Sequence, residues 1–147
     1  MNPNYVHTIT IYNRLQASDS PDRKEHWYRH VLNECFFTSR LTAVQGARAD
    51  TMLHVEQKNS YTVRIPGKKA YKKYVEWSIL PEEQKNDFFT ITDGDIIIKG
   101  ECAEEISAEL GQTATQLLRK YKPEAFAVTA FSDNTSHFVD KHYRIGG

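Results

Sequence analysis

Two aspartates flank a glycine at Asp93-Gly94-Asp95 and precede a run of three isoleucines at 96–98. A hard cation needs several oxygen ligands that converge on one point, and two carboxylates could supply part of such a set. The residues that follow lack the further acidic positions and the closing glutamate of an EF-hand loop. Asp-Gly is also a common turn dipeptide, because glycine adopts backbone conformations that other residues resist. The pattern therefore favours a turn that leads into a buried strand over a metal site.

Histidines are the second group that could bind a metal, and two of them, His26 and His30, are four residues apart. On a helix this spacing places two imidazoles on one face, as zinc proteases require, but Trp27 stands where those enzymes have a glutamate. On a strand the two side chains would share a face at a separation of roughly 13 Å, too far for one metal ion. We expect surface or packing roles for the six histidines, which are His7, His26, His30, His54, His137 and His142.

The two cysteines, Cys35 and Cys102, are far apart and neither belongs to a CxxC pair, so their spacing does not indicate zinc. We predict two reduced, buried thiols. The sequence contains no GxSxG nucleophile elbow and no GxxxxGK or GxGxxG phosphate loop. We therefore predict no catalytic, cofactor-binding or metal-binding residue and no enzyme activity. The alternative is a small metal-dependent enzyme that uses Asp93, Asp95 and histidines.

The strongest local charge feature is a segment rich in lysine and tyrosine within residues 68–74. Basic side chains interleaved with aromatic ones can bind phosphates and stack bases, as a nucleic-acid-binding module would. A flexible basic loop can instead dock on an acidic protein neighbour. A solvated loop is the third interpretation, because acidic residues follow closely. The candidate interaction residues are Lys68, Lys69, Tyr71, Lys72, Lys73 and Tyr74.

The bulk composition is that of one globular domain. The 147 residues, 39% of them hydrophobic and 26% charged, fit a single domain over 1–147. Lys plus Arg and Asp plus Glu each number 19, which gives no general attraction to nucleic acid or to an anionic membrane. No apolar run is long enough to span a bilayer, and the N-terminus lacks a secretion-signal pattern. We expect a protein that folds in a cytoplasm and makes no membrane contact.

Strands account for most of the elements expected in the first half of the chain. Residues 5–12 alternate in polarity and predict a strand, followed by a polar loop over 13–24. Residues 25–41 fit either a helix or two strands with a turn at Asn33-Glu34, and their aromatic and β-branched content favours strands.

The middle of the chain predicts a hairpin and then a connection. Residues 51–57 and 60–66 could pair as strands with Lys58-Asn59 near the turn, and a proline at the end of the second strand cannot donate to a ladder. A lysine-rich connection of undefined structure covers 67–80.

Two helical insertions are expected. Pro81 with the following carboxylates predicts one or two helical turns within 81–89, because negative charge favours the start of a helix. Residues 103–121 are predicted to be helical at least from Thr113 on, with basic residues in the last turn.

Three further strands complete the expected fold. A short buried strand covers 95–100, and closing strands cover 125–132 and 137–145, joined by a turn at 133–136. About seven short strands that do not alternate regularly with helices predict a mainly β fold. The expected architecture is a small antiparallel β-barrel or sandwich with long loops and one or two helical insertions.

Six short sequence segments in this chain resemble, in their order and spacing, those of a family of small uncharacterised proteins encoded in prophages of Gram-positive bacteria. The segments are TITIYN at 8–13, HWYR at 26–29, YTVRIP at 61–66, DGDIIIKG at 93–100, VTAFSDN at 128–134 and HYRIGG at 142–147. The resemblance covers nearly the whole chain and implies a gene in the head and head–tail connection region of a long-tailed phage. It carries over no catalytic residue.

More distantly, the ordered pattern resembles the head-closure (stopper) proteins of such phages, which are small β-barrels with long loops. This resemblance implies a homo-oligomeric ring with a portal or adaptor protein and a tail protein as partners, possible contact with packaged DNA, and a place in the virion. The longer segment 67–90 and the helix near 103–121 depart from a minimal stopper. Because of these departures, the protein could be a stopper, an adaptor, a tail-terminator-like protein or a minor capsid component. Its docking loops would be 13–24, 41–50 and 66–80.

Overall fold

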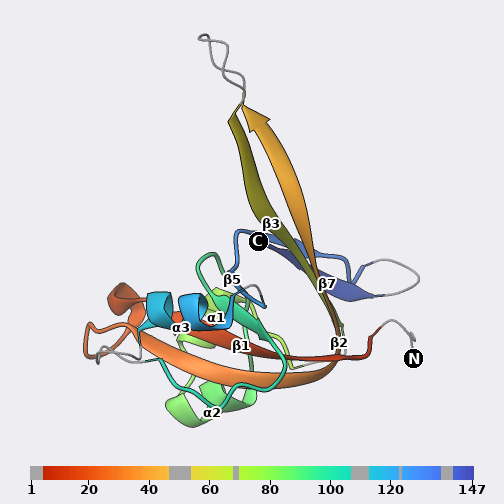
Figure 1. Ribbon diagram of the computed structural model, residues 1–147. Helices are drawn as coiled ribbons and strands as arrows, with labels where there is room; N and C mark the ends of the chain where they lie inside the picture. Colours follow the sequence, from red (N-terminus) through yellow and green to blue (C-terminus); the bar gives the residue numbers. More distant parts are fainter. Residues whose placement is uncertain (1–4, 47–53, 68–69, 107–112, 123, 137–140) are drawn as a thin grey trace.

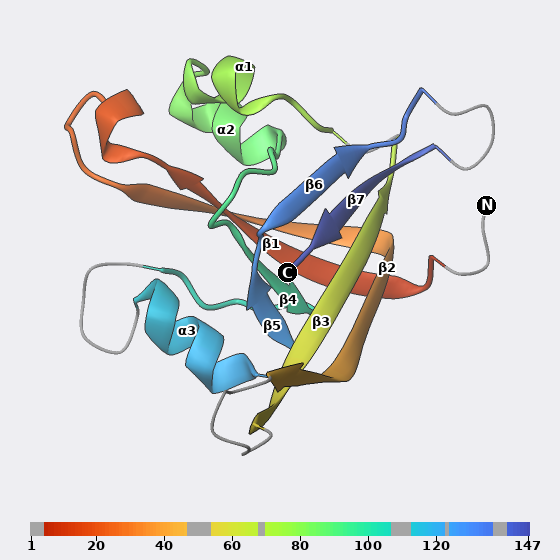
Figure 2. The same cartoon turned by 90° about the horizontal axis from the view of Figure 1, so that it is seen from above.

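Antiparallel strands form one curled sheet in the computed structural model, which describes residues 5–46, 54–67, 70–106, 113–122, 124–136 and 141–147 (Figure 1, Figure 2). Among these residues the sheet has seven strands in the order β5-β4-β1-β2-β3-β7-β6. The sheet curls into a half-barrel, which confirms the predicted mainly β class. The strands are β1 (His7–Leu15), β2 (His26–Gly46), β3 (His54–Pro66), β4 (Ile96–Lys99), β5 (Ala125–Ala127), β6 (Ala130–Asp133) and β7 (His142–Gly146).

The short strand β4 lies inside the sheet and is covered on both faces. Ile97 packs in the core within the half-barrel, whereas Ile96 and Ile98 pack on the opposite face. A strand buried on both sides needs a continuous apolar run rather than an alternating one, which explains the isoleucine triplet. The predicted buried strand is confirmed.

β1 confirms the strand predicted over 5–12 and extends it to Leu15, into the predicted loop. The extension carries a fully buried polar side chain, Asn13, whose hydrogen-bonding groups are satisfied by other segments. Its Oδ1 accepts a hydrogen bond from Thr90 N at 3.1 Å, and its Nδ2 donates to Asp95 Oδ2 at 3.0 Å. The rest of the predicted loop contains a short 3-10 turn, η1 (Ala17–Asp19).

β2 is a single long strand, so the prediction of two strands with a turn at Asn33-Glu34 is wrong, and so is the helical alternative. At the expected turn the strand bends instead. Glu34 has a φ of +57°, and the register with β1 shifts between His7 and Ile9. An irregularity of this kind bends a strand and increases its twist. Before the bend β2 pairs with β1, and after it β2 pairs with β3.

The far ends of β2 and β3 leave the body together as a two-stranded ribbon, here named the arm, which comprises residues 40–46 and 54–60 (Figure 1). The predicted turn at Lys58-Asn59 is wrong, because both residues lie within β3. The loop predicted over 41–50 is wrong as far as Gly46, and residues 47–53 lie outside the described residues.

Residues 125–132, predicted as one strand, form β5 and β6 at the two opposite edges of the sheet. At the break Val128 N donates to Asp95 O at 2.7 Å, and Thr129 N donates to Gly146 O at 2.9 Å. The chain thus crosses directly from one sheet edge to the other. The closing strand β7 starts at His142, and residues 137–140 of the predicted strand lie outside the described residues. The predicted turn at 133–136 is confirmed by Thr135 N donating to Asp133 Oδ1 at 2.9 Å.

In the part of the chain that the structure describes, three short α-helices lie around the sheet: α1 (Tyr74–Ser78), α2 (Glu82–Asp87) and α3 (Ala114–Tyr121). α2 confirms the helical turns predicted over 81–89. α3 confirms the helix predicted from Thr113 on, and it begins after a capping box formed by Thr113 and Gln116, whereas residues 103–106 are not helical. α1 lies in the stretch predicted as an undefined connection, and its Trp77 is fully buried edge-on against Tyr28, with ring centroids 5.3 Å apart.

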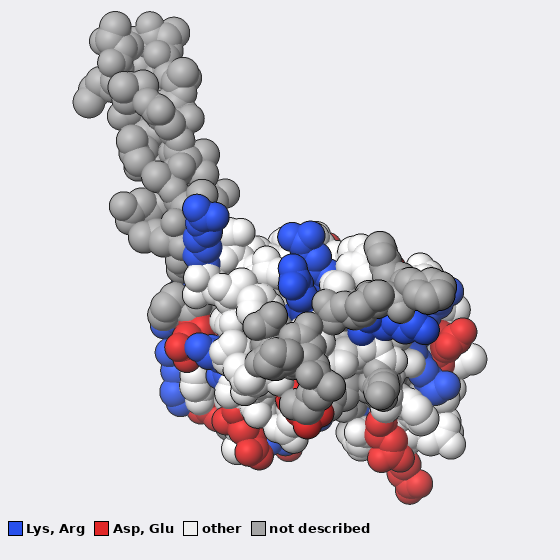
Figure 3. All heavy atoms as spheres, turned by 90° about the vertical axis from the view of Figure 1, so that its right-hand side faces the viewer, with Lys and Arg blue, Asp and Glu red and all other residues white. Residues whose placement is uncertain are grey.

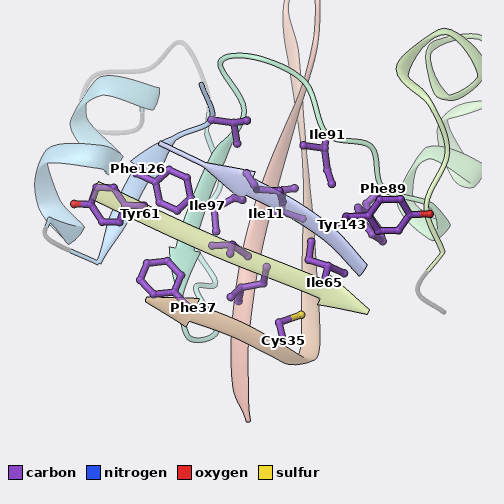
Figure 4. Close-up of a cluster of buried hydrophobic side chains, with 14 residues drawn as sticks. Ile11, Cys35, Phe37, Tyr61, Ile65, Phe89, Ile91, Ile97, Phe126 and Tyr143 are labelled. Carbon is purple, nitrogen blue, oxygen red and sulfur yellow. The ribbon is translucent and has the colours of Figure 1, made fainter. Parts of the chain in front are cut away.

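The main core fills the inside of the half-barrel (Figure 4). Aromatic side chains from three strands meet at one end, where the rings of Tyr61 and Phe126 stack at 4.6 Å and Phe37 lies 5.9 Å from Phe126. A smaller core on the outer side of the sheet receives Leu117 of α3. Within the described residues, no helix combines the length and the apolar character that crossing a membrane requires.

Candidate functional site

The predicted turn at Asp93-Gly94-Asp95 is confirmed, and its two carboxylates diverge. Gly94 has a φ of +91°, and Asp95 N donates to Thr92 O at 3.1 Å, which closes the turn. The Asp93 side chain is exposed, whereas the Asp95 side chain is fully buried. This turn therefore does not gather two carboxylates around one point.

The Asp95 carboxylate connects the turn to β1 by accepting three hydrogen bonds. Arg14 N donates to Oδ1 at 3.0 Å, while Thr92 N and Asn13 Nδ2 donate to Oδ2 at 2.9 and 3.0 Å. Burial raises the pKa of Asp95 to about 6, and these hydrogen bonds act in the opposite direction because they favour the ionised form. The arrangement makes Asp95 a structural link, since donors already occupy both of its oxygens.

The histidines lie in separate environments. His26 pairs with Asp22 at 2.8 Å near the surface, and His7 Nδ1 accepts a hydrogen bond from Phe37 N at 3.2 Å. His30 is buried, and burial lowers its pKa to about 4. The side chain of His142 lies 3.3 Å from Asn134 Nδ2. The side chains of His54 and His137 lie outside the described residues.

The residues that could hold a metal do not gather in one place in the described part of the chain. No group of three or more His, Cys, Asp or Glu side chains there could hold an ion. Cys35 and Cys102 are reduced and buried, as predicted, but they belong to different cores on the two faces of the sheet.

The lysine–tyrosine segment has its two tyrosines built into the fold. The Tyr71 ring lies 4.4 Å from Tyr143 and 5.8 Å from Phe89. The Tyr74 hydroxyl donates to Asp19 Oδ2 at 2.7 Å. Burial is the main cause that raises the pKa of Tyr74 to about 12, and this hydrogen bond is the second cause.

The lysines of this segment have varied surroundings. Lys72 Nζ lies 4.7 Å from the centre of the Phe88 ring, and Lys73 precedes α1. Lys68 and Lys69 lie outside the described residues. A role of the segment in binding a partner stays a prediction.

Strand register brings together a set of basic side chains that the sequence does not reveal. Arg64 of β3 lies opposite Arg144 of β7, and Arg40 of β2 lies opposite Ser60 of β3. Val63 and Ile145, their neighbours in sequence, point into the core, so the arginines face outward. We name this outer surface, comprising Arg40, Arg64 and Arg144, the arginine face. Finding it required the pairing of three strands from distant parts of the chain.

Comparison with known proteins gives a family and no described activity. The model of a Family of unknown function (DUF6751) matches residues 5–147. No curated protein and no solved structure matches the chain. Because the match covers nearly all of the sequence, the chain belongs to this family of unknown function, DUF6751.

Proposed function

We propose that this protein is a structural subunit of a phage or prophage particle at the junction of head and tail, as a head-closure (stopper) or adaptor-like ring protein. Its partners are further copies of the chain, a portal or adaptor protein and a tail protein. It acts in the virion after assembly in the host cytoplasm. The arm is the observation that carries this proposal.

The arm is a ribbon that lacks a third strand. β1 pairs with β2 only as far as Cys35, and β7 pairs with β3 only from Thr62 to Pro66. From Arg40 outward, within the described residues, the two strands of the arm pair only with each other. A two-stranded ribbon alone is at best marginally stable in water, and it gains stability when another strand or surface packs against it. A neighbouring subunit would supply that surface.

Exposed strand edges give such an assembly its means of attachment. All four residues of β6 are exposed, and β6 is the last strand of the sheet. An exposed edge can accept a strand from another chain through backbone hydrogen bonds. If the arm of one subunit contacts a different surface on the next, the contact is head-to-tail and closes into a ring when the rotation allows. The resemblance of the six short sequence segments to prophage connector proteins agrees with this role.

Deletion of the gene from its prophage tests the role directly. After induction we expect separate heads and tails in electron micrographs, because the junction is incomplete, and few joined particles. Complementation with the wild-type gene should restore joined particles, and mass spectrometry should detect the protein in them. Normal particle yields without the gene, or absence of the protein from intact particles, would refute the proposal.

A shortened-arm variant tests the observation on which the proposal rests. Residues 41–59 are replaced by Asn-Gly, which joins Arg40 to its partner Ser60 by a two-residue hairpin turn. We expect thermal unfolding of the body to be retained, because the two main cores lie outside the arm, and joining of heads to tails to be lost. The matched control, Lys122→Gln on the exposed surface after α3, should support particle formation.

A further inference from the structure

We propose that the arginine face binds the phosphate backbone of a nucleic acid duplex. The proposal concerns a surface that shares only the base of the arm, at Arg40 and its partner Ser60, and that is distinct from the lysine–tyrosine segment. It holds or fails independently of the place of the protein in a virion.

The first argument is that two positively charged side chains repel each other on this face. Arg64 and Arg144 are directly opposite each other on neighbouring strands, where side chains are about 5 Å apart at Cβ and like charges destabilise a sheet. Neither forms an ion pair with a described carboxylate. An anion between the two guanidinium groups would turn this repulsion into attraction.

The second argument is the state of Arg64 itself. Its guanidinium lies 5.5 Å from the centre of the Phe36 ring, and its Nε is buried without a hydrogen-bond partner in the described structure. A buried donor without a partner is costly, and such groups call for an explanation. The aromatic ring supports the guanidinium, so the group is positioned before an acceptor arrives. A phosphate oxygen is an acceptor that guanidinium groups bind well.

The third argument is the chemistry of the surrounding surface. A hollow beside Arg144 is lined by the hydroxyl-bearing residues Ser60, Thr62, Thr129 and Ser132. Hydroxyl groups and arginines together are the groups that contact phosphate oxygens in protein–nucleic acid complexes. Within the body and the base of the arm, the strand register places no acidic residue on this outer face; its members there are Phe36, Thr38, Arg40, Ser60, Thr62, Arg64, Pro66, Ala130, Ser132, His142, Arg144 and Gly146.

The fourth argument is the extent of the positive surface on a chain whose formal net charge is zero. In Figure 3 Lys and Arg side chains gather on the upper part of the body, and the Asp and Glu side chains in view lie mainly below them. Arg40 is four residues along β2 from Phe36, the partner of Arg64, so the face extends over roughly 13 Å. A surface of that length suits a row of phosphates better than a single small anion.

Fluorescence anisotropy of a labelled 20-base-pair DNA duplex with the full-length protein tests the proposal. Three phosphate contacts predict a loss of about 40-fold in affinity between 50 and 200 mM salt. The exposed Arg144→Gln variant should bind more weakly at 50 mM salt and lose only about 12-fold over the same range, since each lost contact flattens the salt dependence. The matched control is Arg119→Gln, an exposed arginine on α3, which should behave like the wild type.

The outcomes separate the proposal from its rivals. Absence of binding at 50 mM salt overturns it. Equal loss of binding in the Arg119 and Arg144 variants would also overturn it, because attraction would then be general rather than local. Tighter binding to polyglutamate than to the duplex would identify the face as a docking surface for an acidic protein instead. Unchanged thermal unfolding of Arg144→Gln ensures that a loss of binding reports on the face.

Discussion

Asp95 and His30 are buried ionisable side chains whose pKa values move in opposite senses. Burial raises the pKa of Asp95 to about 6 from an ordinary value of 3.8, and it lowers the pKa of His30 to about 4 from 6.5. In both cases the fold disfavours the charged form, because water is excluded from the site. The two residues belong to different strand regions, so each can be altered separately.

The opposed shifts predict how stability depends on pH. For Asp95 the stabilising contribution is full below pH 4 and is lost as the pH rises through about 6. For His30 it is full above pH 6.5 and is lost as the pH falls through about 4. Each effect is on the order of 3 kcal/mol at 1.36 kcal/mol per pKa unit, so the two nearly cancel. We expect the wild-type protein to show little change in unfolding free energy between pH 4.5 and 6.

Single substitutions should reveal how each residue changes the dependence of the unfolding free energy on pH, measured by urea unfolding across this range. The Asp95→Asn variant retains only the histidine term, so its stability should rise with pH. The His30→Gln variant retains only the aspartate term, so its stability should fall with pH. At pH 4.5 Asp95→Asn should also be destabilised by about 2 kcal/mol, because its NH₂ group would face one of the three donors now bonded to the carboxylate, and this deficit should shrink as the pH rises. If the unfolding free energies of the wild type and of both variants depended on pH in the same way, that result would contradict the pKa shifts of Asp95 and His30.

Among the secondary-structure elements, β2 depends most on one unusual backbone conformation. Glu34 adopts a φ of +57°, in the left-handed region that side chains other than glycine and asparagine rarely occupy. The bend at this residue lets one strand pair first with β1 and then with β3. The same residue therefore controls how the body connects to the arm.

Substitution of Glu34 tests this dependence. A β-branched residue is the least tolerant of positive φ, so Glu34→Val should lower the unfolding free energy by about 1–2 kcal/mol. Glu34→Gly removes the conformational penalty but makes the unfolded chain more flexible, so its stability should lie within about 1 kcal/mol of the wild type. Thermal unfolding followed by circular dichroism provides the comparison. A valine variant as stable as the glycine variant would show that the bend tolerates ordinary backbone angles.

Local sequence patterns predicted those elements whose cause is local. The Asp-Gly turn and the helix from Thr113 on depend on neighbouring residues, and the sequence predicts both. At Glu34 the sequence predicts a chain reversal where the strand only bends, because turn residues mark an irregularity but do not reveal whether the chain turns back or continues. The split of 125–132 into β5 and β6 depends on hydrogen bonds that Val128 N and Thr129 N donate to the carbonyl oxygens of Asp95 and Gly146, which lie elsewhere in the sequence.

Across the whole molecule, hydrophobic patterning predicted the class of fold and one buried strand, but not the arm or the arginine face. The arm follows from a pairing register that continues past the body, and its residues carry no pattern that separates them from ordinary strands. The arginine face requires Arg64 and Arg144 to be opposite each other although 80 residues separate them in the chain. Long-range pairing is the information that one sequence does not display.

The difference in packing between body and arm predicts two levels of stability in one chain. Local opening costs little where few apolar side chains are buried, and it approaches the global unfolding free energy in a core. β4 is buried on both faces, whereas the arm has no third strand among the described residues. Hydrogen exchange followed by mass spectrometry should therefore show fast exchange in peptides covering 40–46 and 54–60 and slow exchange in those covering 93–100. If the arm is covered by a neighbour in assembled particles, its exchange should slow there by at least tenfold while that of β4 stays the same. Slow exchange of the arm in the isolated protein would mean that the ribbon is stable alone, and the argument that it needs a partner would fail.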